Sequence, residues 1–308
     1  MKKIAPKKGF TLVEMVITIV LITIIFAVVG TFLNRPIQAY AQTYQLADIA
    51  DMADMAIIRL ERDVRNGVPN SLRTKISGNF VAVEMVNAIE GQRYRVGSGG
   101  GGLNCPNHCL NIGSADGAFD VEGKFAYASY GSASNYRLVI YNTGAFTGTS
   151  DSPNAGVNVY SNTTAPGPVP PSGSAVITPS GSNVNLISAS AEDQVSLSPL
   201  MNFGLASPRQ RLYVVDTPIT YLCNLTAGTL TRYWGYAIQS TQPIDPTVAP
   251  LNSGGTSSAL IAKNVSACTF NYNVGSTQQN GILGIDLVLT RGGESVRVYY
   301  QVNSNNSS

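Results

Sequence analysis

The sequence has few charged residues and a single histidine. Charged residues make up 12% of its 308 residues, whereas Gly, Ser, Thr and Asn abound. This composition is typical of an exported β-rich domain rather than of a charge-dense cytosolic enzyme. His108 is the only histidine, so any Ser-His-acid or Cys-His catalytic site would have to include it. We therefore expect a protein that is not an enzyme and that needs no cofactor or metal.

The sequence also has no excess of positive charge. Residues 1–9 hold four lysines and no acid, and without them 16 basic residues stand against 18 acidic ones, a formal charge of −2. A nucleic-acid-binding surface would be strongly basic. We therefore expect no nucleic-acid partner.

A basic leader precedes a long apolar segment. Lysines beside such a segment keep that end in the cytoplasm. From Met15 to Leu33 there are 19 residues without a charge, about 28 Å of helix, close to the roughly 30 Å hydrocarbon core. A secretory signal would be shorter and would end in an Ala-x-Ala-like site, but Arg35-Pro36-Ile37 follows here. We expect a single-pass inner-membrane protein with its C-terminal domain in the periplasm.

A carboxylate, Glu14, stands at the start of this segment, where charge is costly. The run before it resembles the processing site of type IV pilins and type II secretion pseudopilins, and reads Lys7-Lys8-Gly9-Phe10-Thr11-Leu12-Val13-Glu14. In that family a prepilin peptidase cuts after the glycine, here Gly9, and the new N-terminal residue, here Phe10, is N-methylated. The resemblance implies that Glu14 pairs with the Phe10 amine of a neighbouring subunit during filament assembly. A plain membrane anchor and a cleaved Sec-type signal are the alternatives.

Helical periodicity continues beyond the membrane segment. Apolar residues follow the i, i+3, i+4, i+7 spacing of one helix face; they are Ile49, Met52, Ala53, Ala56, Leu60 and Val64. Asn66-Gly67-Val68-Pro69 predicts the end of the helix. We expect a membrane and assembly half over residues 10–35 and an amphipathic half over residues 36–67, with a kink or local melting at Pro36.

The amphipathic half also offers two i, i+4 ion pairs, Arg59 with Asp63 and Glu61 with Arg65.

Residues 68–308 read as a β-rich periplasmic head with irregular loops near 97–117 and 143–179. Alternating or β-branched runs predict strands; they are Phe80–Val86, Phe125–Tyr130, Tyr136–Tyr141, Arg211–Asp216, Ile219–Cys223, Thr229–Tyr236, Ala267–Tyr272, Ile282–Thr290 and Ser295–Val302. Arg291-Gly292-Gly293-Glu294 predicts a hairpin turn. The predicted fold class is α+β: a long N-terminal helix packed on an antiparallel sheet, as in pilins.

Four cysteines outside the cytoplasm suggest two disulfides, for which three connectivities are possible. We favour Cys105–Cys109, across a loop bent by Pro106, and Cys223–Cys268, between two strands of one sheet. A small metal cluster at Cys105-Pro106-Asn107-His108-Cys109 is the alternative, but zinc takes four ligands and no second Cys/His pair has matching spacing.

Two further patterns have weaker functional interpretations. Residues 97–102 match Gly-x-Gly-x-x-Gly, but Leu103-Asn104-Cys105-Pro106 follows instead of a helix, so a nucleotide site is not expected. Tyr233, Trp234 and Tyr236 could form a carbohydrate platform, although a strand packed against the helix is the preferred interpretation.

The resemblance extends past the N-terminus to minor pilin-like subunits of the mannose-sensitive haemagglutinin (MSHA) pilus. The matching segments lie in 59–71, 207–216, 221–223, 230–236 and 264–268. The resemblance implies a structural subunit that enters or initiates a pilus at the cell surface. Its partners would be the prepilin peptidase, other pilins, the inner-membrane assembly platform and membrane lipid. A minor pseudopilin of a type II secretion system, and a membrane-anchored periplasmic carbohydrate-binding or enzymatic domain, are the alternative functions.

Overall fold

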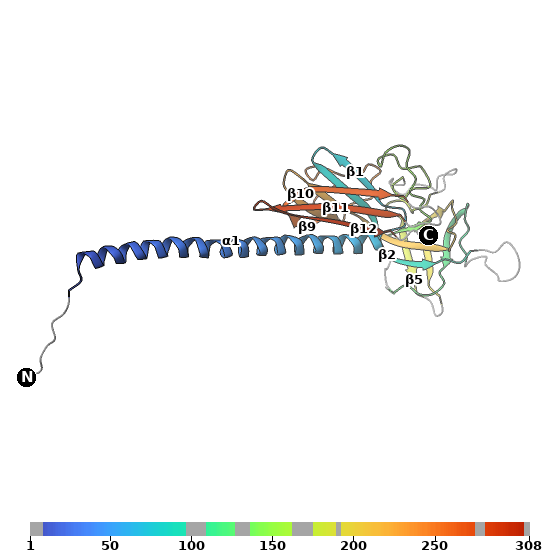
Figure 1. The fold of residues 1–308 in the computed structure, drawn as a ribbon. Coiled ribbons are helices and arrows are strands. Elements are labelled where there is room, and N and C mark those ends of the chain that lie inside the picture. The colour runs from blue at the N-terminus through green and yellow to red at the C-terminus, as the bar shows by residue number, and fades with distance from the viewer. Residues whose placement is uncertain are drawn as a thin grey trace, which may run out of the picture.

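The protein consists of one long helix and a β-rich head. The computed structural model describes residues 9–96, 109–126, 136–161, 175–188, 192–274 and 281–304. The helix, α1 (Leu12–Arg65), projects from the head with its N-terminal half and packs on it with its C-terminal half (Figure 1). Thr11 caps its start and Asn66 its end. The predicted α+β class, with a long N-terminal helix, is confirmed.

The helix is continuous through Pro36, and Figure 1 shows no sharp bend in it. The predicted kink or local melting is therefore wrong. A proline in a helix removes its own N–H hydrogen bond, here to the carbonyl of Phe32, and crowds that carbonyl. The turns before and after it keep their hydrogen bonds, and these maintain the helical path.

The described strands form three antiparallel sheets. The first has the order β1-β2-β7-β8-β9, with β4 also paired to β7; its strands are β1 (Arg73–Ser77), β2 (Phe80–Arg93), β4 (Arg137–Ile140), β7 (Arg211–Asn224), β8 (Thr229–Trp234) and β9 (Ser257–Lys263). The second, β10-β11-β12, contains β10 (Val265–Asn273), β11 (Ile282–Arg291) and β12 (Glu294–Asn303). The third, β3-β6-β5, contains β3 (Ala115–Asp120), β6 (Gln194–Asn202) and β5 (Asn183–Ile187).

The C-terminal half of α1 lies against β9 at the edge of the first sheet and against β12 at the edge of the second. On the β9 side, the Lys263 amide donates a hydrogen bond to Met52 Sδ at 3.2 Å. On the β12 side, the Tyr300 hydroxyl donates to Glu61 Oε2 at 2.9 Å. Exposed sheet edges offer unpaired backbone groups to other chains. The helix therefore contacts the edge strand of each sheet, although most residues of β9 and β12 are exposed or only partly buried.

The predicted apolar stripe of the helix faces the core. Ile49, Ala53, Leu60 and Val64 are at most 2% exposed, and they join side chains of both neighbouring sheets in one buried cluster. Burying a leucine or isoleucine contributes about 1.5–3 kcal/mol each. The C-terminal half of α1 is therefore held by burial in its own head.

A second buried cluster lies further from the helix, between the third sheet and the far halves of β2 and β7. β7 reaches both clusters because it is one continuous strand, whereas the sequence suggested two strands over 211–216 and 219–223. Its partner changes along its length: Ile219–Asn224 pair with β8, and Leu212–Val215 pair with β4. The change falls at Asp216–Pro218, opposite a register irregularity in β2.

Two expectations about the middle of the chain need correction. Of the predicted strand 125–130, Phe125 and Ala126 are described and lie outside any strand, and the rest of that segment lies outside the described residues. The neighbouring predicted strand forms β4, which pairs with β7. The loop predicted near 97–117 gives way to β3 at Ala115. The described parts of the 143–179 loop are irregular as predicted, but Tyr160 and Ile177 within them are fully buried.

Candidate assembly site

Gly9 and Phe10 precede the helix and are exposed, and residues 1–8 lie outside the described residues. Thr11 caps the helix: its Oγ1 accepts a hydrogen bond from the Glu14 amide at 3.3 Å. Thr11 and Glu14 have the spacing of a capping box, a local signal that the sequence analysis overlooked. The structure shows the threonine half of that motif. Among the described residues the Glu14 carboxylate has no hydrogen-bond or ion-pair partner, so it is free to bind a group from another molecule.

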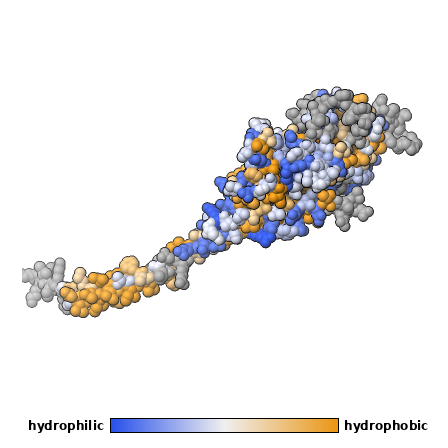
Figure 2. Space-filling view, turned by 90° about the horizontal axis from the view of Figure 1, so that it is seen from above, coloured by the Kyte–Doolittle hydropathy of each residue, from blue (hydrophilic) through white to orange (hydrophobic). Residues whose placement is uncertain are grey.

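The first 19 residues of α1 form an apolar surface. Leu12–Gly30 has a mean hydropathy of 2.9 and none of it is buried inside the protein. Figure 2 shows this end of the molecule as an almost continuous hydrophobic surface. The hydroxyls of Thr18 and Thr23 donate to backbone carbonyls of the preceding turn at 2.8–2.9 Å. Their hydroxyl hydrogens are therefore already hydrogen-bonded when the helix lies in lipid. The segment can therefore lie in a bilayer or against other apolar helices.

Further along α1, a second set of exposed apolar residues, the outer stripe, lies on the side that faces away from the head. Its members are between 61% and 76% exposed and are Ile37, Tyr40, Tyr44, Met55 and Ile58. With 3.6 residues per turn, the outer stripe lies opposite the buried stripe. The helix thus has apolar surface on two sides, and the head covers only one.

An ion pair joins the end of the helix to the head. Asp63 Oδ2 accepts hydrogen bonds from Arg232 Nε at 2.6 Å and from the Tyr221 hydroxyl at 2.7 Å. The sequence suggested that Asp63 pairs with Arg59, but the carboxylate turns inward to β7 and β8, where burial strengthens its hydrogen bonds. The second predicted pair, Glu61 with Arg65, is present at 2.6 Å.

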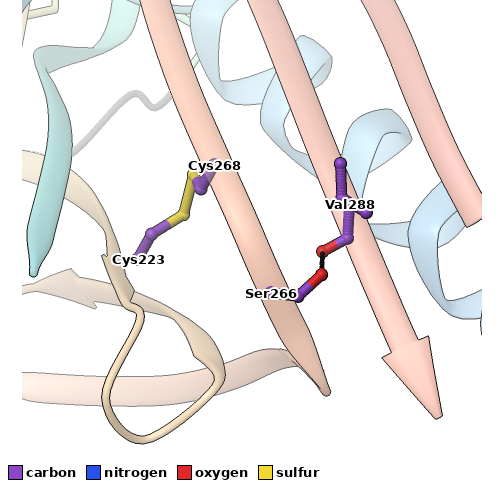
Figure 3. The surroundings of a disulfide bond; sticks show 4 residues. All are labelled: Cys223, Ser266, Cys268 and Val288. Atoms are coloured by element: carbon purple, nitrogen blue, oxygen red, sulfur yellow. Dashed lines mark hydrogen bonds between the residues drawn. A yellow bond between two sulfur atoms is a disulfide. The ribbon is translucent and has the colours of Figure 1, made fainter. Parts of the chain in front are cut away.

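A disulfide lies beside the buried stripe (Figure 3). It joins Cys223 of β7 to Cys268 of β10, at a sequence separation of 45. These strands belong to different sheets, so the expectation that the bond ties two strands of one sheet is wrong. Ser266, also on β10, donates a hydrogen bond to the Val288 carbonyl of β11 (Figure 3). The disulfide therefore holds together the two sheets that receive the helix.

A buried ion pair on the other side of the first sheet fixes two loops. Arg73 binds Glu84 at 2.6 Å and donates to the carbonyls of Ser150, Gln239 and Ser240. Burial raises the pKa of Glu84, because desolvation disfavours its charged form. Arg73 also stacks on Tyr160, 3.6 Å from the ring centroid. Sequence analysis missed this network because its members are scattered along the chain.

The other predicted cysteine and histidine residues are described only in part. Cys105 and His108 lie outside the described residues, and so does the Gly-x-Gly-x-x-Gly match. Cys109 is buried and disulfide-bonded. Within the described ranges, no group of three or more His, Cys, Asp or Glu residues is placed to hold a metal ion.

The three aromatic residues of the predicted platform do not form one. Trp234 packs toward the helix-side core, whereas Tyr233 and Tyr236 belong to a cluster on the opposite face of the sheet. Alternation along a strand separates Tyr233 from Trp234.

Comparison with known proteins identifies one segment of the chain. The prokaryotic N-terminal methylation motif matches residues 4–30, the segment that contains Gly9, Phe10 and Glu14. No curated protein and no solved structure matches the chain. Together with the apolar helix, the motif indicates membrane anchoring. The chain thus carries the N-terminal processing signal of type IV pilins and pseudopilins, which implies cleavage by a prepilin peptidase.

Proposed function

We propose that the protein is a minor pilin-like structural subunit, cut between Gly9 and Phe10 and N-methylated at Phe10. It enters or initiates an MSHA-type type IV pilus through the inner-membrane assembly platform, and it catalyses no reaction of its own. The observation that carries this proposal is the set of exposed apolar residues in the outer stripe, which lie on the same helix as the motif but beyond its membrane-length segment. An isolated membrane anchor needs lipid-facing residues only within the bilayer, whereas a filament subunit also needs apolar surface beyond it to pack on neighbours.

The choice of an MSHA-type pilus rests on resemblance to the minor pilin-like protein MshO. The resembling segments come together in the fold at the end of α1, in β7 and β8, and at the start of β10. They include Asp63, Tyr221, Arg232 and both cysteines of the Cys223–Cys268 disulfide. The resemblance thus includes the part of the head that receives the helix, although the part of segment 207–216 that lies in β7 belongs to its far half.

Two other functions remain as alternatives. A minor pseudopilin of a type II secretion system would share the motif and the helix, so deletion of the gene separates the two: loss of surface pili supports the proposal, and loss of exoprotein secretion with normal pili supports the alternative. A membrane-anchored binding or enzymatic domain would stay unassembled. Co-purification of the subunit with other pilins from membranes supports the proposal against that third function.

The cleavage step is tested by the intact mass of protein extracted from membranes. The natural chain should lack residues 1–9 and carry one methyl group on Phe10. Gly9→Val should leave the full-length precursor, because a peptidase that accepts a residue without a side chain cannot accept a branched one. Gly30→Val is the matched control and should be processed normally, because Gly30 lies in the apolar helix beyond the cleavage site and a Cβ added there meets nothing within 4 Å. A mature mass that still contains Lys2 to Gly9 contradicts the proposal.

A further inference from the structure

The switch of partner strands along β7 leaves a notch in the first sheet. β8 ends at Trp234 and β4 begins at Arg137, so neither strand flanks Asp216–Pro218. Concave sites that combine apolar walls with a few polar groups are the usual ligand sites of proteins. The notch lies outside the helix and the outer stripe, so its role is independent of the proposed assembly function.

The notch has a volume of about 490 Å³, within the usual range for small-molecule sites. The lining residues with side chains that suit a ligand are Arg137, Ser180, Asp216, Thr217 and Trp234. Residues 235–238 form another wall. This wall is held in place because Arg73 binds the next two carbonyls, those of Gln239 and Ser240.

The indole ring of Trp234, which forms the aromatic side of the notch, is held in place without a ligand. The Arg232 guanidinium lies over the Trp234 ring, 4.6 Å from its centroid, and Arg232 is itself held by Asp63. Cation–π stacking of this kind restrains an indole ring. A ligand that contacts Trp234 therefore loses little affinity to ordering of that side chain.

The charges at the notch balance. Arg137 is buried and donates to the Thr178 carbonyl; burial lowers the pKa of Arg137 to about 10, which leaves it protonated at neutral pH. Asp216 supplies the opposite charge. Its Oδ1 accepts hydrogen bonds from the Asn87 amide group and the Thr217 backbone amide, so Oδ2 is the oxygen left for a ligand.

We propose that the notch binds a neutral saccharide of two or three units, with a sugar face on Trp234 and hydroxyls bonded to Asp216, Arg137 and Ser180. Sugar hydroxyls both donate and accept, so one ring can satisfy a carboxylate and a guanidinium together. The C–H face of a pyranose matches the apolar, electron-rich face of an indole. A phosphate group fits less well, because Asp216 opposes it and Arg137 is the one cation among the described residues that line the notch.

Trp234 is the only tryptophan, so its emission reports on the notch directly. The full chain, in a detergent without a sugar headgroup, is titrated with neutral trisaccharides of gluco, manno, galacto and N-acetylglucosamine type. Inorganic phosphate, trigalacturonate and a neutral tripeptide amide form the comparison arms. At least one neutral trisaccharide should shift the emission saturably, with half-saturation near or below about 1 mM.

Asp216→Asn is the decisive variant. Asparagine keeps the Oδ1 acceptor for Asn87 and Thr217 but replaces Oδ2 with a donor, so the fold should survive while saccharide affinity falls about tenfold. Asp245→Asn is the matched control: Asp245 Oδ1 likewise accepts from a neighbouring backbone amide, that of Thr247, and Asp245 does not line the notch. Ser180→Leu, which occupies the notch, should abolish the shift.

Three outcomes overturn the proposal. One is the absence of a saturable shift with every neutral trisaccharide. The second is equal or stronger binding of phosphate, trigalacturonate or the tripeptide amide. The third is unchanged affinity in Asp216→Asn or Ser180→Leu, since binding would then lie elsewhere on the molecule.

Discussion

The two halves of α1 obtain their stability from different sources. The C-terminal half buries Ile49, Ala53, Leu60 and Val64 in the head and is held further by Asp63. The N-terminal half, Leu12–Gly30, buries nothing within the chain. One end of the same helix is therefore stabilised by contacts within the chain, and the other end depends on lipid or neighbouring subunits. Changes in the C-terminal half of α1 should affect folding of the head, and changes in its N-terminal half should affect assembly.

The largest expected effect is on assembly and comes from Glu14. Glu14→Val removes a carboxylate without a partner among the described residues, so the subunit should be processed and its head should unfold at the same denaturant concentration as the natural chain. It should nevertheless fail to enter filaments or complexes, because it cannot pair with the Phe10 amine of a neighbour. Glu14→Asp should be intermediate, since it keeps the charge but shortens the reach. Co-purification with other pilins measures this, and normal incorporation of Glu14→Val would rule out the ion-pair mechanism.

The largest expected effect on folding comes from the disulfide between the two sheets. Replacing Cys223 and Cys268 together by alanine should destabilise the head by about 4 kcal/mol, the chain-entropy value for a 45-residue loop. Denaturant unfolding followed by Trp234 emission measures the loss. Cys109→Ala, which opens the other predicted disulfide, is the control and should cost less because Cys105–Cys109 would close a far shorter loop. An equal cost for both would contradict a structural role specific to the Cys223–Cys268 bond.

A matched pair of leucines tests the comparison most directly. Leu60→Ala should cost the head about 3 kcal/mol, because it removes a side chain that is 1% exposed and leaves a cavity. Leu21→Ala makes the same chemical change at a residue that is 53% exposed, and it should leave unfolding of the head unaltered in detergent. The midpoint of denaturant unfolding distinguishes them. A similar shift for both would mean that the two halves of α1 fold as one unit.

The Asp63 junction should have a smaller effect. Asp63→Asn keeps a hydrogen-bond acceptor for the Tyr221 hydroxyl but leaves the mostly buried Arg232 cation without its counter-charge, at a cost of about 2 kcal/mol. In a double-mutant cycle, Asp63→Asn combined with Arg232→Gln should cost less than the sum of the two single changes. Additive costs would show that the ion pair does not couple the helix to β8.

The smallest expected effect is on the pH dependence of stability, and it comes from an ion pair in the second sheet. Arg297 donates two hydrogen bonds to Asp286, and this pairing lowers the pKa of Asp286 below its usual 3.8. A carboxyl whose folded-state pKa is lowered stabilises the protein above its unfolded-state pKa, and this contribution disappears as pH falls through the folded value. Arg297→Gln should therefore be slightly less stable than the natural chain at neutral pH and equal to it well below pH 3.8. A difference that grows on acidification would contradict this assignment.

Local sequence signals predicted the elements that depend on neighbours in the chain. The apolar periodicity of residues 49–64 predicted the buried face of α1, and the Gly292-Gly293 pair predicted the β11–β12 turn, where both glycines adopt positive φ. The strands β1, β3, β5, β6 and β9 were not predicted. Their short or mixed sequences have weak patterns, and pairing with distant strands decides their conformation.

The side-chain contacts of the candidate sites were less predictable. Arg73 and Glu84 read as ordinary strand charges in the sequence, yet they form a buried pair because loops 77 to 167 residues away along the chain close over them. The notch at Asp216 follows from the switch of β7 between β8 and β4. No local pattern encodes such a switch, because it depends on where two other strands end.

The sequence by itself determined the processing signal, the apolar membrane-length segment and the amphipathic stripe that follows it. Each of these is a property of consecutive or regularly spaced residues, and helix geometry converts spacing directly into a surface. The tertiary structure alone decided that Asp63 turns to Arg232, that Cys223 and Cys268 join two different sheets, and that α1 lies between the edges of β9 and β12. These contacts join residues far apart in the chain, and their energies come from burial that exists only once the sheets have assembled.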